Sequence, residues 1–573
     1  MIKLMRYLRD YKLESVVGPL FKFFEACLEL LVPIVMARVI DVGVKNGDSG
    51  YILRMGAVLA AFALSGVVCA LTAQYFAAKA SMGFGTKLRA DLYRHVNRLS
   101  FAELDTAGAP TLITRLTSDA NQAQASINLT LRLLLRSPFI VLGAIAMAFT
   151  IDARLTLIFI GATALLGLCV FFVMRATIPL YRRIQSRLDR VSRLTRESLS
   201  GARVIRAFSR QASEKADYEA ETGELLRAQV RAGRLSALLN PATSAIVNAA
   251  IALLVWQGGY RVFAGGITQG EVVALVNYMT QILVALLALS NLIVQMARGS
   301  ASAARLNELF ALRPSIVDGP GAQTEEGANA VEFQRVSFRY PGAGAPSLAD
   351  VSFAAPRGST IGVIGGTGSG KSTLVNLIPR MYDATEGSVK VFGADVKQYR
   401  LRELRGRIGV APQRAALFRG TIRENLQWGK PGATDEEITR ALTVAQAADF
   451  VFASPEGLDR HIEQGGRNLS GGQRQRLTIA RALVGEPDIL ILDDSASALD
   501  YATDARLRRA IRENTRDMTV FIVSQRVSSI RQADAILVLD DARLAGVGTH
   551  EALMRDCAVY REIALSQEKE AKA

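Results

Sequence analysis

The chain has 573 residues, of which half are hydrophobic, and a formal net charge of +15 at pH 7. That length exceeds what one hydrophobic core usually supports, so we expect two or more domains. The positive mean hydropathy is unusual for a soluble protein and indicates a membrane part joined to a soluble part. Arginines alternate with acidic residues along helical stretches, without an aromatic-rich basic stripe. This pattern favours basic cytosolic loops of a membrane protein over nucleic-acid binding.

Two sequence features typical of secreted proteins are missing. The four cysteines (Cys27, Cys69, Cys169 and Cys557) show no paired spacing, which supports neither a disulfide framework nor a cysteine metal site. The N-terminal segment is basic and amphipathic, and no small-residue cleavage site follows it, so we do not expect a signal peptide.

The first half contains six apolar stretches long enough for membrane-spanning helices, which need about 20 mostly apolar residues. The connections alternate between short loops and two long basic ones, near 79–131 and 181–240. If the basic ends lie in the cytosol, both termini lie there too. Apolar periodicity continues through the long connections, so we expect the membrane helices to extend into the cytosol. The six stretches run near 15–42, 52–78, 132–151, 154–180, 241–264 and 271–297.

Two short segments interrupt the long cytosolic connections. Leu99–Asp105 precedes a turn at 108–110, and Leu199–Phe208 ends a charged helix. Each is either a simple corner between helices or a contact for another domain.

Charged residues occur inside the first apolar stretch. Glu25 and Glu29 lie four residues apart on one helical face, with Lys22 one turn earlier. Charge within a membrane is costly and normally faces a cavity or a partner, so both glutamates are candidate contacts for a transported substrate. The alternative is an internal ion pair, or solvation near the cytosolic end of the helix.

The composition changes after the sixth stretch. A loop-like region rich in Gly, Pro, Asp and Glu runs from Pro314 to Gly327. From about residue 330, strand-like runs alternate with helical patterns, as in an α/β domain with a largely parallel sheet. We therefore expect a transmembrane domain over 1–312, a linker over 313–329 and a second domain over 330–573.

A glycine-rich loop in the second domain has the form of a P-loop. It follows the apolar run 360–364 and precedes a helical pattern, which is the strand–loop–helix context that this motif requires. Its backbone would wrap around phosphates, Lys371 would reach the terminal phosphates, and the Ser372 hydroxyl would hold Mg²⁺. The expected fold class is therefore multi-domain, an all-α six-helix transmembrane domain followed by an α/β P-loop nucleotide-binding domain. The loop consists of Gly365, Gly366, Thr367, Gly368, Ser369, Gly370, Lys371, Ser372 and Thr373.

A second motif narrows the class of nucleotide-binding protein. Leu469 is followed by Ser470, Gly471, Gly472 and Gln473 at the start of a basic helix, where backbone N–H groups and the helix dipole suit a phosphate. The buried strand 490–494 then ends in Asp493 and Asp494, carboxylates suited to a magnesium shell.

With these ordered motifs, the chain resembles the ATP-binding cassette (ABC) family over nearly its whole length, and the six-span half resembles exporter-type half-transporters. The resemblance implies that Tyr340 stacks on adenine and that Gln413 senses Mg²⁺. It also implies that Asp493 associates with Mg²⁺ together with Ser372, and that Ser497–Asp500 crosses a dimer interface. The family buries two ATP molecules between facing cassettes. Each is held by one chain's P-loop and by the partner's signature, here Ser470, Gly471, Gly472 and Gln473, with Asp500 also contacting in trans. The two interrupting segments would then be coupling elements.

Two positions depart from the family pattern. Where the family has a glutamate that acts as general base, this chain has Asp494, one methylene shorter. Its carboxylate should sit roughly 1 Å farther from the attacking water. Where the family has a switch histidine, this chain has Gln525, which can donate a hydrogen bond but cannot carry a proton or charge. Both changes affect the same ATP site.

We therefore expect one half of a heterodimer. Its own site would bind ATP and hydrolyse it poorly, while its signature would serve the partner's competent site. The function expected is ATP-driven export of a lipophilic, drug-like or peptide substrate across a bacterial inner membrane, with the nucleotide-binding domain in the cytoplasm. Three alternatives remain open: an exporter-fold importer of an iron–siderophore substrate, a nucleotide-sensing regulatory subunit, and a soluble DNA-associated ATPase. The six spans disfavour the last.

Overall fold

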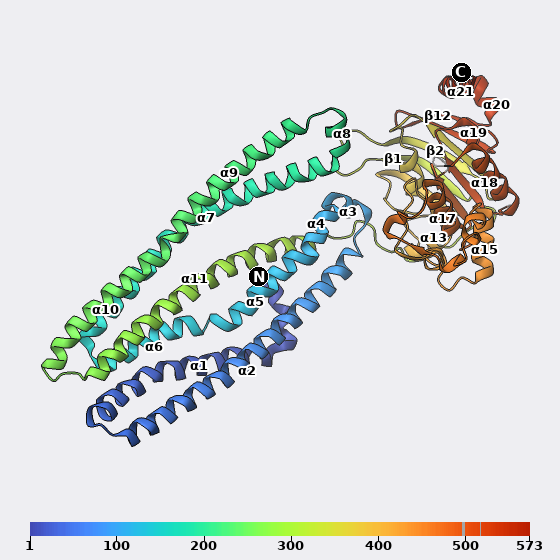
Figure 1. The fold of residues 1–573 in the computed structure, drawn as a ribbon. Coiled ribbons are helices and arrows are strands. Elements are labelled where there is room, and N and C mark those ends of the chain that lie inside the picture. Colours follow the sequence, from blue (N-terminus) through green and yellow to red (C-terminus); the bar gives the residue numbers. More distant parts are fainter. Residues whose placement is uncertain (496–498, 516, 573) are drawn as a thin grey trace. The chain divides into compact units, whose positions relative to one another are not determined.

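The computed structural model describes residues 1–495, 499–515 and 517–572, which form two compact units (Figure 1). The first unit comprises Met1–His95 and Pro110–Ala311. The second comprises Val96–Ala109 and the chain from Leu312 onward. The short segment 96–109 thus interrupts the first unit and packs within the second.

The first unit is entirely helical, and its longest helices exceed the thickness of a bilayer core. Helices α2 and α7 have 48 residues each and α11 has 43, whereas about 20 residues suffice to cross the hydrocarbon. The expected extension of membrane helices beyond the apolar stretches is therefore present. The helices are η1 (Ile2–Tyr11), α1 (Lys12–Arg38), the π-helical η2 (Val39–Val44), α2 (Ser49–Val96), α4 (Ala109–Thr114), η3 (Arg115–Asp119), α5 (Ala120–Leu133), α6 (Arg136–Ile151), α7 (Ala153–Ser200), α8 (Ala202–Ala207), α9 (Gln211–Ala237), α10 (Leu239–Phe263) and α11 (Gln269–Ala311).

Among the described residues, five helical segments are long and apolar enough to cross a membrane, against six expected. They are Ser49–Val96, Ala109–Ile151, Ala153–Ser200, Gln211–Phe263 and Gln269–Ala311. The stretch expected at 15–42 corresponds to α1 and η2, and the difference arises because Lys22, Glu25 and Glu29 place three charges in the middle of α1. A membrane crossing by α1 stays a prediction.

The core of the first unit lies between α1, α6, α7, α10 and α11. Tyr278 on α11 is fully buried there, and its hydroxyl donates a 2.6 Å hydrogen bond to the Leu30 carbonyl of α1. A buried phenol normally needs such a partner. Pro33 has no N–H, so the Glu29 carbonyl four residues earlier lacks its helical partner, and Gln281 of α11 donates to it at 3.3 Å.

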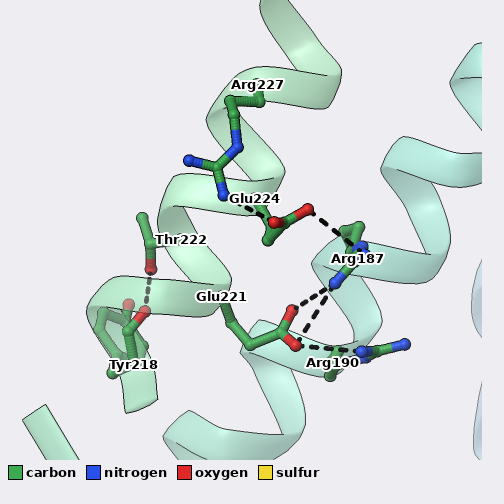
Figure 2. A network of polar contacts seen from close by, with 7 residues as sticks. All are labelled: Arg187, Arg190, Tyr218, Glu221, Thr222, Glu224 and Arg227. Carbon is green, nitrogen blue, oxygen red and sulfur yellow. Dashed lines mark hydrogen bonds and ion pairs between the residues drawn. The ribbon is translucent and has the colours of Figure 1, made fainter. Parts of the chain in front are cut away.

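Helices α7 and α9 form a long pair joined by the short helix α8 (Figure 1). Ion pairs hold their polar part together (Figure 2). Glu221 accepts from Arg187 at 3.2 Å and from Arg190 at 3.0 Å, and Glu224 contacts Arg187 at 3.4 Å and Arg227 at 2.6 Å. A network of shared partners stabilises the pair more than isolated surface ion pairs would, since each arginine is already ordered by another contact.

The described part of the second unit contains three sheets: a four-stranded antiparallel sheet (β2-β1-β4-β5), a six-stranded sheet (β12-β11-β3-β10-β9-β6) and the pair β7-β8. In the six-stranded sheet only β12 is antiparallel. The strands are β1 (Val331–Phe338), β2 (Leu348–Ala355), β3 (Thr360–Gly365), β4 (Glu386–Val391), β5 (Ala394–Asp395), β6 (Ile408–Ala411), β7 (Gly420–Thr421), β8 (His461–Ile462), β9 (Ile489–Asp493), β10 (Thr519–Val523), β11 (Ala535–Asp540) and β12 (Arg543–Gly548).

The helices of this unit connect and cover the sheets, as an α/β domain requires. They are α3 (Phe101–Ala107), α12 (Lys371–Leu377), α13 (Leu401–Gly406), α14 (Ile422–Leu426), α15 (Asp435–Val444), α16 (Ala448–Phe452), α17 (Gly471–Leu483), α18 (Tyr501–Asn514), α19 (Val527–Ile530), α20 (His550–Asp556) and α21 (Ala558–Lys572), with short turns η4 (Gly457–Asp459) and η5 (Gln464–Gly466).

Register in the six-stranded sheet determines where polar residues meet. Val523 of β10 pairs with Val363 of β3 on one side and with Asp493 of β9 on the other. Next to β9, Ala411 of β6 pairs with Leu492. Because these neighbouring strands are parallel, the residues that follow them emerge at one edge of the sheet.

Candidate functional site

A cavity of about 320 Å³ lies at that edge, and most of the predicted nucleotide-binding residues line it. The P-loop follows β3, Gln525 follows β10, Asp493 ends β9 and Asp494 comes directly after it, and Gln413 follows β6. The lining consists of Tyr340, Ser347, Thr367, Gly368, Gly370, Lys371, Ser372, Thr373, Gln413, Asp493, Asp494, Val523 and Gln525. Gly365, Gly366 and Ser369 belong to the same loop without lining the cavity. Residues that lie at or after the ends of four separate strands thus meet in one cavity.

The loop conformation needs glycine at specific positions. Gly370 has φ +97°, and a Cβ there would lie 2.3 Å from the Ser347 carbonyl oxygen, so any larger residue would clash with backbone. Gly368 has φ +84°. Positive φ values of this kind favour glycine. Lys371 then begins α12 with its side chain folded into the loop.

Lys371 is the cation of the pocket. Its ammonium donates to the Gly365 carbonyl at 2.9 Å and to the Gly366 carbonyl at 2.6 Å. Burial lowers the pKa of Lys371, while Asp494 and Asp493 oppose that shift. A buried ammonium held by two neutral carbonyls is poised to exchange them for anionic oxygens, which are stronger acceptors. Among the described residues, the buried Ser369 hydroxyl of this loop has no hydrogen-bond partner.

The carboxylates face the loop from β9. The Ser372 hydroxyl donates to Asp493 at 3.0 Å, and the Gln413 side-chain amide lies 3.4 Å from Asp494. Burial raises the pKa of Asp493 and of Asp494; hydrogen bonds from Ser372 and Gln413, respectively, counteract it. Asp494 has φ +44°, a left-handed conformation in which aspartate is more common than most residues. Its N–H donates to the Val523 carbonyl at 3.0 Å, which ties this turn to β10.

The pocket contains side-chain oxygens of the kind that bind Mg²⁺. Among the described residues, no group of three or more His, Cys, Asp or Glu could hold a metal ion. Mg²⁺, however, is usually bound by one or two carboxylates together with substrate phosphates. The adjacent oxygens of Ser372 and Asp493, with the Gln413 carboxamide lining the same cavity, meet that requirement.

Tyr340 also lines the cavity, and sequence reasoning missed its neighbour Tyr382. The Tyr340 hydroxyl is 3.2 Å from the Thr373 hydroxyl, and its ring is 5.2 Å from the Tyr382 ring. Tyr382 in turn donates a 2.5 Å hydrogen bond to Asp105 on α3, and its ring lies 6.2 Å from that of Phe101. Burial, together with Asp105, raises the pKa of Tyr382 above its ordinary value.

Helix α3 is the first of the two interrupting segments, and it is anchored at a second point. Ser100 caps α3 in a capping box with Glu103, while its hydroxyl also accepts from the Ile316 N–H at 3.0 Å. Within the second unit, Ser100 and Asp105 therefore fix the segment 99–105 to the chain that follows residue 312. No local pattern marks Tyr382, because its partner lies 277 residues away.

The second motif starts α17 and is separate from the cavity. Ser470 and Gln473 form a capping box, in which the Ser470 N–H donates to Gln473 at 2.9 Å. Ser470 and Gly471 are exposed, and Gly472 and Gln473 are partly exposed. Asp500 caps α18 through the Thr503 N–H at 2.6 Å. Of the predicted interface loop, Ser497 and Ala498 lie outside the described residues.

Glu25 and Glu29 belong to an ion-pair network in the first unit. Lys22 contacts Glu25 at 2.6 Å, and Arg136 on α6 contacts Glu29 at 2.7 Å and Glu25 at 3.9 Å. Gln281 on α11 donates to the Glu29 carbonyl at 3.3 Å. This geometry agrees with the ion-pair alternative, although the Glu29 side chain is still 39% exposed. A role in substrate contact stays a prediction.

Comparison with known proteins identifies the family. The family described as ABC transporter transmembrane region matches residues 16–286, and the family described as ABC transporter matches residues 348–497. An ABC transporter ATP-binding protein of Mycobacterium tuberculosis is 38% identical over 571 residues, covering 98% of this chain and 97% of that protein. The chain belongs to the ABC transporter family. Its ATP-binding domain is an ATPase domain coupled to transport.

Two further comparisons specify the type of ABC transporter. An ATP-dependent lipid A-core flippase of Chromohalobacter salexigens is 32% identical over 575 residues, covering 100% of this chain and 98% of that protein. The solved structure of a bacterial Atm1-family ABC exporter with ATP bound superposes with a TM-score of 0.81 at 25% identity, covering 96% of this chain and 98% of that one. The chain is therefore an integral membrane protein with the fold of an ABC exporter.

Proposed function

We propose that this chain is the degenerate-site half of a heterodimeric ABC exporter. The observation that carries the proposal is the pair Asp494 and Gln525, which line the same cavity as Lys371 and Ser372. The two departures from the family pattern thus fall on one nucleotide. If one of these two positions had changed, the residue at the other could still support hydrolysis. Here the general-base position (Asp494) and the switch position (Gln525) are altered together.

Each lining residue then has a role in holding nucleotide. Tyr340 stacks on adenine, the P-loop backbone and Lys371 bind the phosphates, and Ser372, Asp493 and Gln413 hold Mg²⁺. The metal, when bound, neutralises charge on the phosphate oxygens. Asp494 is the residue in the general-base position, but its shorter side chain withdraws the carboxylate from an attacking water. Gln525 offers a neutral carboxamide where a histidine could share charge.

The signature of this chain serves the other site. Ser470, Gly471, Gly472 and Gln473 are at least partly exposed and do not line the cavity that Lys371 occupies. They are therefore available to a second cassette, and Asp500 beside them would contact the partner as well. Turnover would be driven by the partner's own base facing this signature.

The transported substrate is proposed to be lipophilic, drug-like or peptidic. The apolar helices support this chemistry, and the relatives reported above favour export over import. Because those relatives are bacterial, we place the protein in a bacterial inner membrane with the cassette in the cytoplasm.

The proposal is tested by ATPase measurements on this chain alone and with a second half-transporter encoded beside it. We expect slow phosphate release from the chain alone and release at least about tenfold faster from the co-purified pair, because general-base catalysis typically contributes 10²–10⁴-fold. ATP turnover by the chain alone that equals that of the co-purified pair would contradict the heterodimer proposal. It would leave ATP-driven export intact.

A second prediction concerns the contact between α3 and Tyr382. Tyr382→Phe removes the hydroxyl that bonds Asp105 but keeps the ring beside Tyr340, so ATP affinity should stay unchanged. Transport per ATP hydrolysed should fall about five-fold, the equivalent of one lost hydrogen bond of about 1 kcal/mol. The measurement is substrate transport and phosphate release on the same proteoliposomes. Asp105→Asn keeps an acceptor oxygen and is the matched control, which should behave like the wild type. Equal transport per ATP in both variants would contradict a coupling role.

A third prediction addresses the network around Glu25. In the double variant Glu25→Gln, Glu29→Gln, Lys22 and Arg136 remain without acidic partners, which makes the site cationic. We expect the ratio of cationic to anionic amphiphile transport to fall several-fold, because uncompensated charge in a membrane attracts the opposite charge. Adding Arg136→Gln to the double variant reduces the excess charge and should move the ratio back toward the wild type. An unchanged ratio in both variants would show that the network is purely structural.

A further inference from the structure

The C-terminal helix α21 packs against the short helix α19, which follows the switch position (Figure 1). Tyr560 and Ala564 of α21 share a hydrophobic cluster with Val527 and Ile530 of α19. Ile364, at the end of the strand that leads into the P-loop, belongs to the same cluster. The last helix of the chain is thus in contact with two elements that shape the nucleotide cavity.

Helix α19 begins without a cap of its own. Its N-cap residue is Arg526, whose side chain has no acceptor, and no side-chain capping bond is made by that residue. Helix N-termini leave backbone N–H groups unsatisfied, and Ser, Thr, Asp or Asn normally accept from them. Here Gln567 of α21 supplies the missing acceptor, since the Val527 N–H donates to its Oε1 at 2.9 Å.

The same side chain also binds the switch residue. Nε2 of Gln567 donates to the Gln525 carbonyl at 2.7 Å. One carboxamide therefore spans residues 525 to 527 with two hydrogen bonds, as a neighbouring peptide group would. The turn that carries Gln525 is held from outside by a residue 42 positions later in the chain.

Other contacts hold the remaining part of this turn. The Ser524 N–H donates to the Val363 carbonyl at 3.1 Å, and the Arg526 N–H donates to the Ser524 hydroxyl at 3.0 Å. The Arg526 guanidinium lies 4.8 Å from the centre of the Tyr501 ring at the start of α18. Among the described residues, Gln567 is the side chain of α21 that hydrogen-bonds the Gln525 backbone.

We propose that Gln567 is a positioning residue that fixes the backbone of Gln525, so that the Gln525 carboxamide meets the terminal phosphate of ATP. This inference rests on the proposed nucleotide site. ADP lacks that phosphate. Loss of the Gln567 contacts should therefore weaken ATP binding and leave ADP binding unchanged, whereas a general structural defect would weaken both.

The test uses the full chain and measures the affinities for ATP and ADP, each with Mg²⁺, by displacement of a fluorescent nucleotide. Gln567→Met removes both hydrogen bonds at similar volume, and Gln567→Glu keeps the acceptor for Val527 but loses the donor to Gln525. We expect ATP affinity to fall about five- to tenfold in both variants, with ADP affinity retained. Ser566→Ala is the matched control, because the Ser566 hydroxyl donates to the Ile563 carbonyl within α21.

A double-variant cycle shows whether Gln567 acts through Gln525. In a Gln525→Ala background, Gln567→Met should cause no further loss of ATP affinity, since coupled residues are non-additive. The inference would be overturned if the losses of ATP affinity were additive. It would also be overturned if the ratio of ATP to ADP affinity stayed unchanged, whether both affinities fell equally or neither fell. Lys371→Ala distinguishes a failure of the proposed nucleotide site from a failure of the positioning role of Gln567. If it fails to weaken nucleotide binding, the proposed site itself is wrong; if it does weaken it while the Gln567 variants keep the wild-type ratio, only the positioning role is wrong.

Discussion

The double variant Asp494→Glu, Gln525→His should turn the chain alone into an active ATPase, with phosphate release increased about 100-fold. Both residues line the cavity that holds Lys371 and Asp493, so the missing groups would be restored where the phosphates bind. Glutamate brings a carboxylate roughly 1 Å closer to an attacking water, and histidine restores a group that can carry charge. Neither substitution alters the P-loop.

The two changes should be interdependent. Each single variant lacks one of the two groups that act on the same phosphate, so we expect each to give far less than half of the combined gain on a logarithmic scale. The measurement is steady-state phosphate release at saturating MgATP. Because Asp494 has φ +44°, where glutamate is less well tolerated than aspartate, thermal unfolding of each variant is the folding control. Adding Lys371→Ala should return the rate to baseline. A double variant no faster than the wild type would contradict the assignment of these positions.

In the co-purified pair, Gly471→Glu in this chain should reduce ATPase activity about 100-fold, the effect of removing one preorganised electrostatic contact to a reacting phosphate. Gly471 is exposed at the first position of α17, next to the capping box of Ser470. A glutamate there adds negative charge where the partner's ATP should bind. It should not disturb folding, since acidic residues are stabilising in the first turn of a helix.

Lys371→Ala in this chain gives the matched comparison. It disables only the chain's own P-loop, whose ATP is held with little turnover, so activity of the pair should fall only a few-fold. The informative quantity is the ratio of the two losses, measured on the same preparation with the partner unchanged. Equal losses, or a greater loss from Lys371→Ala, would mean that this chain's own site carries the turnover. The degenerate-site proposal would then be wrong.

Several features of the fold could be predicted because they depend on residues close together in the sequence. The P-loop is one: its strand, glycines and lysine lie within 14 consecutive residues, 360–373, and local backbone geometry requires glycine at positions such as Gly370. The long helices are another, because apolar stretches and periodicity indicate them directly. The helix predicted at 15–42 is present as α1 and η2, although three charges keep it below the hydropathy of a spanning helix.

Residues joined by long-range contacts could not be found in this way. Tyr382 contacts Asp105 across 277 residues, and Arg136 contacts Glu29 across 107. Nothing in the neighbourhood of either residue distinguishes it from other surface tyrosines or arginines. Only packing brings the partners together.

The sequence by itself therefore determined the ABC family, the P-loop, the signature and the two departures at Asp494 and Gln525, since each is a short motif whose chemistry follows from residue type and spacing. Tertiary structure alone decided that those two residues share one cavity, that Arg136 pairs with Glu25 and Glu29, and that Gln567 holds the switch turn. The physical reason is strand order. Parallel pairing in the order β3-β10-β9-β6 sets side by side the ends of strands that lie far apart in the chain.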